Sequence, residues 1–138
     1  MKDFKNIGIV GAGSMGIGIA QIASTSGCKV FLYDQNVEIA QSALNKLKKI
    51  LERLIEKKRI NSNKRDEILS NIKIVSSLND LSGSNLIIEA IIENLNIKKD
   101  LFSKLETIVH KECIIASNTS SLSITNLASS LNNSSNFI

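Results

Sequence analysis

Several residue types are scarce in this chain of 138 residues, and each shortage narrows what the protein can be. Proline and tryptophan are absent, and aromatic residues make up only 4% of the sequence. Because basic surfaces that bind single strands interleave cations with aromatic side chains, no nucleic-acid partner is expected. No apolar run is long enough to cross a bilayer, so we expect no membrane partner either. The first residues lead directly into a strand with no visible signal peptide, which predicts a cytoplasmic protein.

Cysteine is also scarce. The two cysteines, Cys28 and Cys113, each begin an apolar segment and do not form a C-x-x-C pair. We therefore predict two reduced, buried thiols, and neither a metal site nor a redox pair. The chain length allows one substantial core but is short for a two-domain enzyme.

The strongest motif that is present lies in residues 6–27, which read NIGIVGAGSMGIGIAQIASTSG. A short apolar strand is followed by glycines in G-x-G-x-x-G spacing and then by an amphipathic helix. Gly11 permits a tight turn, Gly13 lets a pyrophosphate approach the backbone, and Gly16 lets the helix lie close to the sheet. The helix N-terminus offers N–H groups to an anion. The candidate cofactor-binding residues are those of the loop and first turn: Gly11, Ala12, Gly13, Ser14, Met15 and Gly16.

The helix after this loop has a predicted buried stripe and a predicted end. Its apolar residues at helical spacing are Met15, Ile19, Ile22 and Ala23. Gly27 is placed to end the helix, as a glycine just beyond a helix usually does.

Asp34 follows the second apolar strand, 29–33, and predicts which cofactor is bound. A carboxylate at this position accepts hydrogen bonds from ribose hydroxyls and repels a 2′-phosphate. Gln35 and Asn36 come next, with no arginine nearby to receive that phosphate, so we predict NAD rather than NADP. The alternative is an ordinary strand-to-helix turn in which Asp34 merely caps the next helix.

The rest of the chain alternates strands with helices, which predicts an α/β fold with a doubly wound parallel sheet of the Rossmann type. A long helix over 37–60 and a short one over 65–70 form a helical hairpin between the second and third strands. The remaining expected elements are strands at 73–76, 86–88 and 113–116, helices at 97–110 and 124–131, and a sixth strand beginning at 137–138.

The net charge of +4 is concentrated in this hairpin. Its basic residues are Lys46, Lys48, Lys49, Arg53, Lys57, Lys58, Arg59, Lys64 and Arg65. A basic face on a dinucleotide-binding protein suggests a second anionic ligand. A solvated lysine-rich face, with Glu52 and Glu56 interspersed, explains the charge pattern equally well.

Two polar segments follow the fourth and fifth strands, where the crevice of such a sheet opens. Glu93 and Lys98 are candidates for the nicotinamide-side ribose, or else form an exposed charge pair at a helix start. The turn at 117–122 either faces the crevice with several donors or simply caps a helix. His110, the single histidine, is predicted in the last turn of a helix at the opposite edge of the sheet, which leaves the chain without a general base.

Four stretches together give a family resemblance: IGIVGAGSMGIGIAQ, the strand ending in Asp34, IIEAIIENLNIKKDLF and IIASNTSSLSIT. They resemble the N-terminal NAD-binding domain of 3-hydroxyacyl-CoA dehydrogenases, including the bacterial 3-hydroxybutyryl-CoA dehydrogenases. The resemblance covers residues 1–138 and implies one NAD-binding domain.

The resemblance also implies roles for individual residues. Asp34 would bind the adenosine ribose, and Glu93 and Lys98 would contact the cofactor. Ser120 would touch both the nicotinamide side and the substrate hydroxyl. Lys57 would contact coenzyme A of an acyl-CoA substrate, whereas a neighbouring contact that is serine in some members is Ile50 here.

In the family, the catalytic histidine and its glutamate partner come after the position of Ile138, followed by an all-helical domain that makes the dimer. The histidine withdraws the hydroxyl proton as hydride leaves C3 for NAD. We therefore expect this chain to hold the cofactor without turning over, and we expect a full-length parent to form a homo-oligomer. The alternatives are a stand-alone NAD-binding module, one half of a split enzyme, and a 3-hydroxyacid dehydrogenase that does not use CoA.

Overall fold

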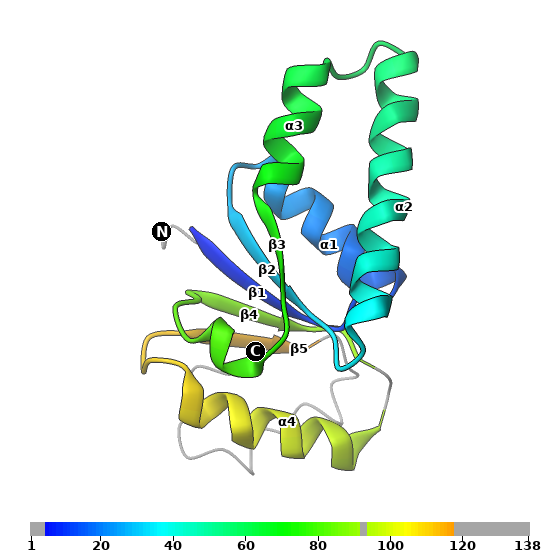
Figure 1. Cartoon of the computed structure of the whole chain (residues 1–138). Helices are drawn as coiled ribbons and strands as arrows, with labels where there is room; N and C mark the ends of the chain where they lie inside the picture. Colours follow the sequence, from blue (N-terminus) through cyan, green and yellow to red (C-terminus); the bar gives the residue numbers. More distant parts are fainter. Residues whose placement is uncertain (1–4, 92–93, 118–138) are drawn as a thin grey trace.

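The computed structural model describes residues 5–91 and 94–117 and shows a parallel sheet of five strands (Figure 1). The strands follow the order β3-β2-β1-β4-β5. The sheet therefore winds outward in both directions from β1, which confirms the doubly wound α/β prediction. The strands are β1 (Asn6–Val10), β2 (Lys29–Tyr33), β3 (Ile72–Val75), β4 (Leu86–Glu89) and β5 (Ile114–Ser117).

Helices cover both faces of this sheet (Figure 1). On one face, α1 and α2 pack over a cluster that includes Ile9 and Leu32, and on the other face α4 packs over a cluster that includes Val10 and Ile87. Adjacent residues of β1 thus serve opposite cores, as the alternation of side chains along a strand requires. The helices are α1 (Ser14–Thr25), α2 (Val37–Glu56), α3 (Ser62–Ser70) and α4 (Leu95–Ile108), with a 3-10 turn η1 (Leu78–Leu81).

The predicted buried stripe of α1 is half correct: Ala23 is buried and Ile19 packs against the core, but Met15 and Ile22 do not. Met15 and Ile22 are 52% and 70% exposed, and the buried positions are Gly16, Ala20, Ala23 and Ser24. The helix lies too close to β1 for large side chains, since a Cβ on Gly16 would overlap the carbonyl oxygen of Gly11. Close approach therefore selects small residues for the inner face and leaves large ones outside.

The helical hairpin forms as predicted, but α2 ends at Glu56 rather than at residue 60. Lys58 adopts a left-handed conformation with φ +58°, and the N–H groups of Lys58 and Arg59 donate to the carbonyls of Ile55 and Leu54. This pattern of bonds is the Schellman ending of a helix. The same ending closes α1 at Gly27, whose φ is +93°, so the predicted helix stop there is confirmed.

Helix α4 is shifted by two residues from its predicted position. The side chain of Asn94 accepts from the Ile97 N–H and begins the helix at Leu95, and Val109 is extended, which ends it at Ile108. His110 therefore lies in the connection to β5 and not in the last helical turn. The helix expected at 124–131 and the strand expected at 137–138 lie outside the described residues.

Membrane-spanning helices and metal sites can be assessed in the described residues. No helix within 5–91 or 94–117 is both long enough and apolar enough to cross a membrane. In the same ranges, no three histidine, cysteine or acidic side chains gather as a metal site would require. Cys28 and Cys113 are not joined in a disulfide; Cys113 is buried as predicted, whereas Cys28 is only half-buried.

Candidate functional site

A cleft of about 830 Å³ opens at the carboxyl ends of the central strands. Its floor comes from the ends of β1 and β2, and its walls come from the segment after β4 and the first turns of α4. The lining includes Gly11, Gly13, Asp34, Ala90, Ile91, Asn96, Ile97, Asp100 and Lys104. This position is the topological switch point at β1, where ligands bind in open α/β sheets.

The glycine loop shapes one wall of this cleft. Gly11 has φ +107°, and a Cβ there would lie 2.6 Å from the carbonyl oxygen of Ala90, so neither the conformation nor the space admits a side chain. A Cβ on Gly13 would meet no atom within 4 Å, because that residue borders open space in the cleft. The backbone at Gly13 is thus bare toward the cavity, which fits the approach of a pyrophosphate.

The N-terminus of α1 lies at the edge of the same space, because Gly13, the residue that precedes the helix, lines the cleft. Gly13 is the N-cap residue, and it supplies no side-chain hydrogen bond to the helix. The partial positive charge of the first turn is therefore left to an outside anion.

Asp34 lies across the loop at the end of β2 and is fixed by two backbone donors. Its Oδ2 accepts from the Ala12 N–H at 2.9 Å, and its Oδ1 accepts from the Asn36 N–H at 2.9 Å. The cap of α2 is Asn36, whose side chain accepts from Glu38 N–H, so the alternative that Asp34 caps this helix is wrong. The carboxylate instead joins the glycine loop to the end of β2.

The opposite wall contains a buried ion pair that sequence reasoning missed. The Lys98 ammonium lies 3.1 Å from Oε1 of Glu89, and both side chains are 0% exposed. Oε1 also accepts from the Ser117 hydroxyl at 2.6 Å, and Oε2 accepts from the Ile91 N–H at 2.7 Å. The only signal in the sequence was a carboxylate that ends an otherwise apolar strand.

This geometry corrects one interpretation of Lys98 and leaves another as a prediction. Lys98 is buried, so it does not belong to an exposed charge pair at the helix start. Its neighbours Asn96 and Ile97 line the cleft. Glu93 and Ser120, the other two predicted contacts on this side, lie outside the described residues.

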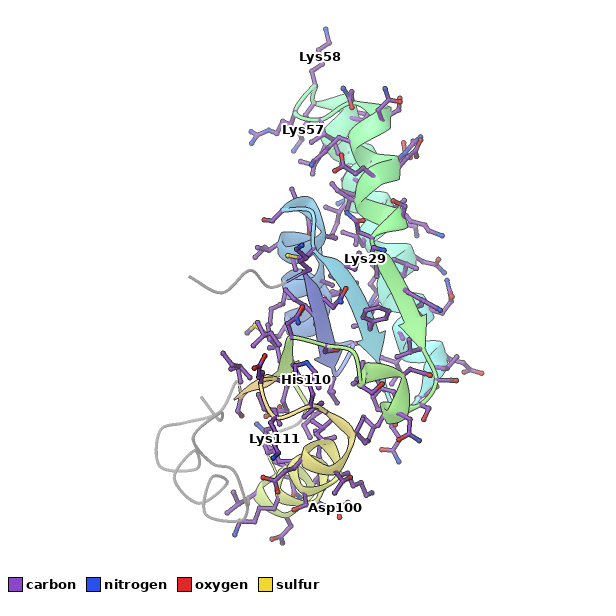
Figure 2. The ribbon with its side chains drawn as sticks, turned by 90° about the vertical axis from the view of Figure 1, so that its left-hand side faces the viewer. Lys29, Lys57, Lys58, Asp100, His110 and Lys111 are labelled. Atoms are coloured by element: carbon purple, nitrogen blue, oxygen red, sulfur yellow. The ribbon has the colours of Figure 1, made fainter. Side chains whose placement is uncertain are left out.

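The remaining predicted positions lie away from the cleft. Lys57 and Lys58 stand at the free end of the helical hairpin (Figure 2). Ile50 is 41% exposed and lines a second groove of about 590 Å³ between α1 and α2, which shares Gly13 and Ile39 with the cleft. His110 is exposed in the connection that precedes β5, hence at the amino edge of the sheet and opposite the cleft, as predicted.

The family profile described as "3-hydroxyacyl-CoA dehydrogenase, NAD binding domain" matches residues 6–138. A probable 3-hydroxybutyryl-CoA dehydrogenase from Deinococcus radiodurans is 41% identical over 131 residues, which are 95% of this chain and 47% of that protein. The corresponding protein of Bacillus subtilis is 40% identical over 130 residues, 94% of this chain and 45% of its own length.

A solved structure agrees. The crystal structure of (S)-3-hydroxybutyryl-CoA dehydrogenase from Ralstonia eutropha superposes with a TM-score of 0.94 at 37% identity, over 99% of this chain and 48% of that one. The chain thus spans about half the length of these relatives. Together with the bare glycine loop and the carboxylate at the end of β2, these matches show that the chain belongs to the NAD-binding domain family of the 3-hydroxyacyl-CoA dehydrogenases.

Proposed function

We propose that this chain is the cofactor-holding part of an NAD-dependent 3-hydroxyacyl-CoA dehydrogenase, an oxidoreductase that interconverts 3-hydroxyacyl-CoA and 3-oxoacyl-CoA. The observation that carries the proposal is the Asp34 carboxylate, held 2.9 Å from the Ala12 N–H and beside the open backbone of Gly13. This arrangement offers a pyrophosphate site and a ribose acceptor on the same side of one cleft.

The chemistry of Asp34 supports NAD over NADP. An ionised carboxylate has about four acceptor positions, and two of them are used by the N–H groups of Ala12 and Asn36. The other positions are left for the two ribose hydroxyls, whereas a 2′-phosphate would bring a second negative charge against Asp34.

Bound NAD would accept the hydride. On the protein side, we place Glu93 and Lys98 at the nicotinamide ribose and Ser120 at the substrate hydroxyl. The one histidine of the sequence, His110, lies at the opposite edge of the sheet and does not serve as general base. We therefore expect this 138-residue polypeptide to bind cofactor without oxidising substrate.

The proposal is tested by titrating the chain with NADH and NADPH, followed by fluorescence. The wild type should prefer NADH at least tenfold. Asp34→Asn should weaken NADH binding at least tenfold and narrow that preference, since one lost charge-assisted hydrogen bond is worth about 1.5–3 kcal/mol. Glu38→Gln, a charge removed from an exposed position nearby, is the matched control and should bind like the wild type. An unchanged preference in Asp34→Asn would remove this residue from the site.

The acyl-CoA part of the proposal rests on Lys57, exposed at the tip of the basic hairpin. Ile50 favours the second candidate, a dehydrogenase of a 3-hydroxy acid without CoA, because an apolar side chain replaces a polar contact of the family. Calorimetric titration with CoA separates the two. Binding that weakens with salt and in Lys57→Ala supports CoA, and no binding by the wild type supports the second candidate.

A further inference from the structure

Glu89 gathers three hydrogen-bond donors from three separate elements onto one buried carboxylate. The Ile91 N–H comes from the segment after β4, the Ser117 hydroxyl from the end of β5 and the Lys98 ammonium from the first turns of α4. The segment after β4 and the first turns of α4 form the wall of the cleft opposite the glycine loop, and β5 lies behind that wall, beside β4.

All three partners are donors, which fixes the kind of side chain that can occupy this position. A carboxylate presents acceptors on both oxygens, whereas a glutamine amide presents one acceptor and one donor. Glutamine at residue 89 would place its NH₂ group against donors in either orientation of the amide. In one orientation the NH₂ group would face the Ile91 N–H, and in the other it would face the Lys98 ammonium and the Ser117 hydroxyl. Such a mismatch is costly in a site with no access to water.

Net stability does not explain why a charged pair occupies this position. A buried pair loses about as much through desolvation as it gains by attraction, and apolar residues of similar volume often do as well or better. What the pair supplies is a fixed geometry for the segments that it joins.

The fixed segment faces the cofactor cleft. Glu89 is in register with Val10, and the next N–H, that of Ala90, donates to the Val10 carbonyl at 2.8 Å. The carbonyl of Ala90 then fills the space that a Cβ on Gly11 would need, and Ala90 and Ile91 both line the cleft. The Ile91 N–H bond to Glu89 thus sets how this backbone meets the glycine loop.

We propose that Glu89 is a positioning residue: it aligns residues 90–91 against the glycine loop and holds them to Lys98 and Ser117 behind the wall of the cofactor cleft. The proposal rests on the proposed function for what the cleft binds. It does not assign Glu89 a contact with the cofactor. The alignment itself is a property of the ligand-free chain.

The test uses Glu89→Gln, Glu89→Asp and Ser117→Ala, each checked for folding by circular dichroism. In the ligand-free chain, we expect the Ile91 amide to exchange at least tenfold faster in Glu89→Gln, while the amides of β2 keep wild-type rates. NADH should bind at least tenfold more weakly. Glu89→Asp keeps the charge but shortens the reach by one methylene, and it should not restore affinity. Ser117→Ala, which removes a single bond, should weaken NADH binding two- to fivefold.

Glu52→Gln is the matched control, because it removes the carboxylate of an exposed ion pair with Arg65 on the hairpin. It should leave both readouts unchanged. A purely structural role for Glu89 would speed exchange uniformly over the sheet, and that outcome overturns the proposal, as does wild-type NADH affinity in Glu89→Gln. If Glu89→Gln does not fold, wild-type behaviour of Ser117→Ala in both measurements overturns it. If the wild type itself binds no NADH, the proposed function fails, and the exchange rates still decide the role of Glu89.

Discussion

The two walls of the cleft differ in which atoms hold them in place, because one is main chain and the other depends on side chains. The glycine-loop wall is backbone: Gly11 and Gly13 present main chain to the cavity, and the Asp34 side chain braces the loop by accepting from the Ala12 N–H. The opposite wall is held by side chains, through Glu89 and Lys98. At Gly11 and Gly16 the glycine loop tolerates no added carbon, whereas the side-chain wall tolerates no lost charge. The two walls should therefore fail under opposite kinds of substitution.

The largest effect should come from adding one carbon to the backbone wall. Gly16→Ala places a Cβ on the carbonyl oxygen of Gly11, where neither backbone can yield easily, and we expect a loss of about 4 kcal/mol or more. Gly18→Ala, on the same helix, meets no atom within 4 Å and should stabilise by about 1 kcal/mol through helix propensity. Urea unfolding measures both. Equal effects would mean that helix propensity, not close approach, governs this wall.

The next effect should come from removing one charge from the side-chain wall. Lys98→Met leaves the buried Glu89 carboxylate without this counter-charge, and we expect a loss of about 3 kcal/mol. Lys104 is a matched control on the same helix: its ammonium lies 3.0 Å from Asp100, but the two side chains are 61% and 68% exposed. Lys104→Met should cost no more than about 0.5 kcal/mol. Similar losses in thermal or urea unfolding would contradict the buried-pair account.

The same contrast explains which parts of the molecule could be predicted from the sequence. The backbone wall was predictable because its constraint is local. Glycines at fixed spacing after an apolar strand are enough to predict a turn that brings bare backbone to a cofactor. The parallel order was predictable because strands and helices alternate. The buried stripe of α1 was not, because the close approach that exposes Ile22 is set by the sheet beneath the helix.

The side-chain wall was also hidden from sequence reasoning. A lysine near the start of a helix looks the same whether it is solvated or buried. Lys98 meets Glu89 from nine positions away, and Ser117 meets it from 28 positions away. Burial of this kind depends on how β4, β5 and α4 come together, and no local pattern reports it.

The smallest effect should come from the two helix ends that share one backbone motif. Gly27 and Lys58 each occupy the left-handed position of a Schellman ending, at φ +93° and +58°. A residue with a Cβ pays about 1 kcal/mol there, which glycine avoids. Lys58→Gly should therefore stabilise the chain by up to about 1 kcal/mol, reduced by the extra freedom that glycine gives the unfolded state. Gly27→Ala should destabilise it by about 1 kcal/mol.

A second variant separates backbone strain from charge in this last prediction. Lys58 stands between Lys57 and Arg59, so its replacement also relieves repulsion among three cations. Lys58→Ala removes the charge but keeps the Cβ, and it should stay within about 0.5 kcal/mol of the wild type in low-salt urea unfolding. If Lys58→Ala stabilises as much as Lys58→Gly, and the gain disappears in high salt, repulsion rather than the left-handed conformation is the cost at the hairpin tip. If only Lys58→Gly stabilises, and does so equally in high salt, the left-handed position favours glycine at both helix ends. Helix α1 then has the favoured residue there, Gly27, and α2 does not.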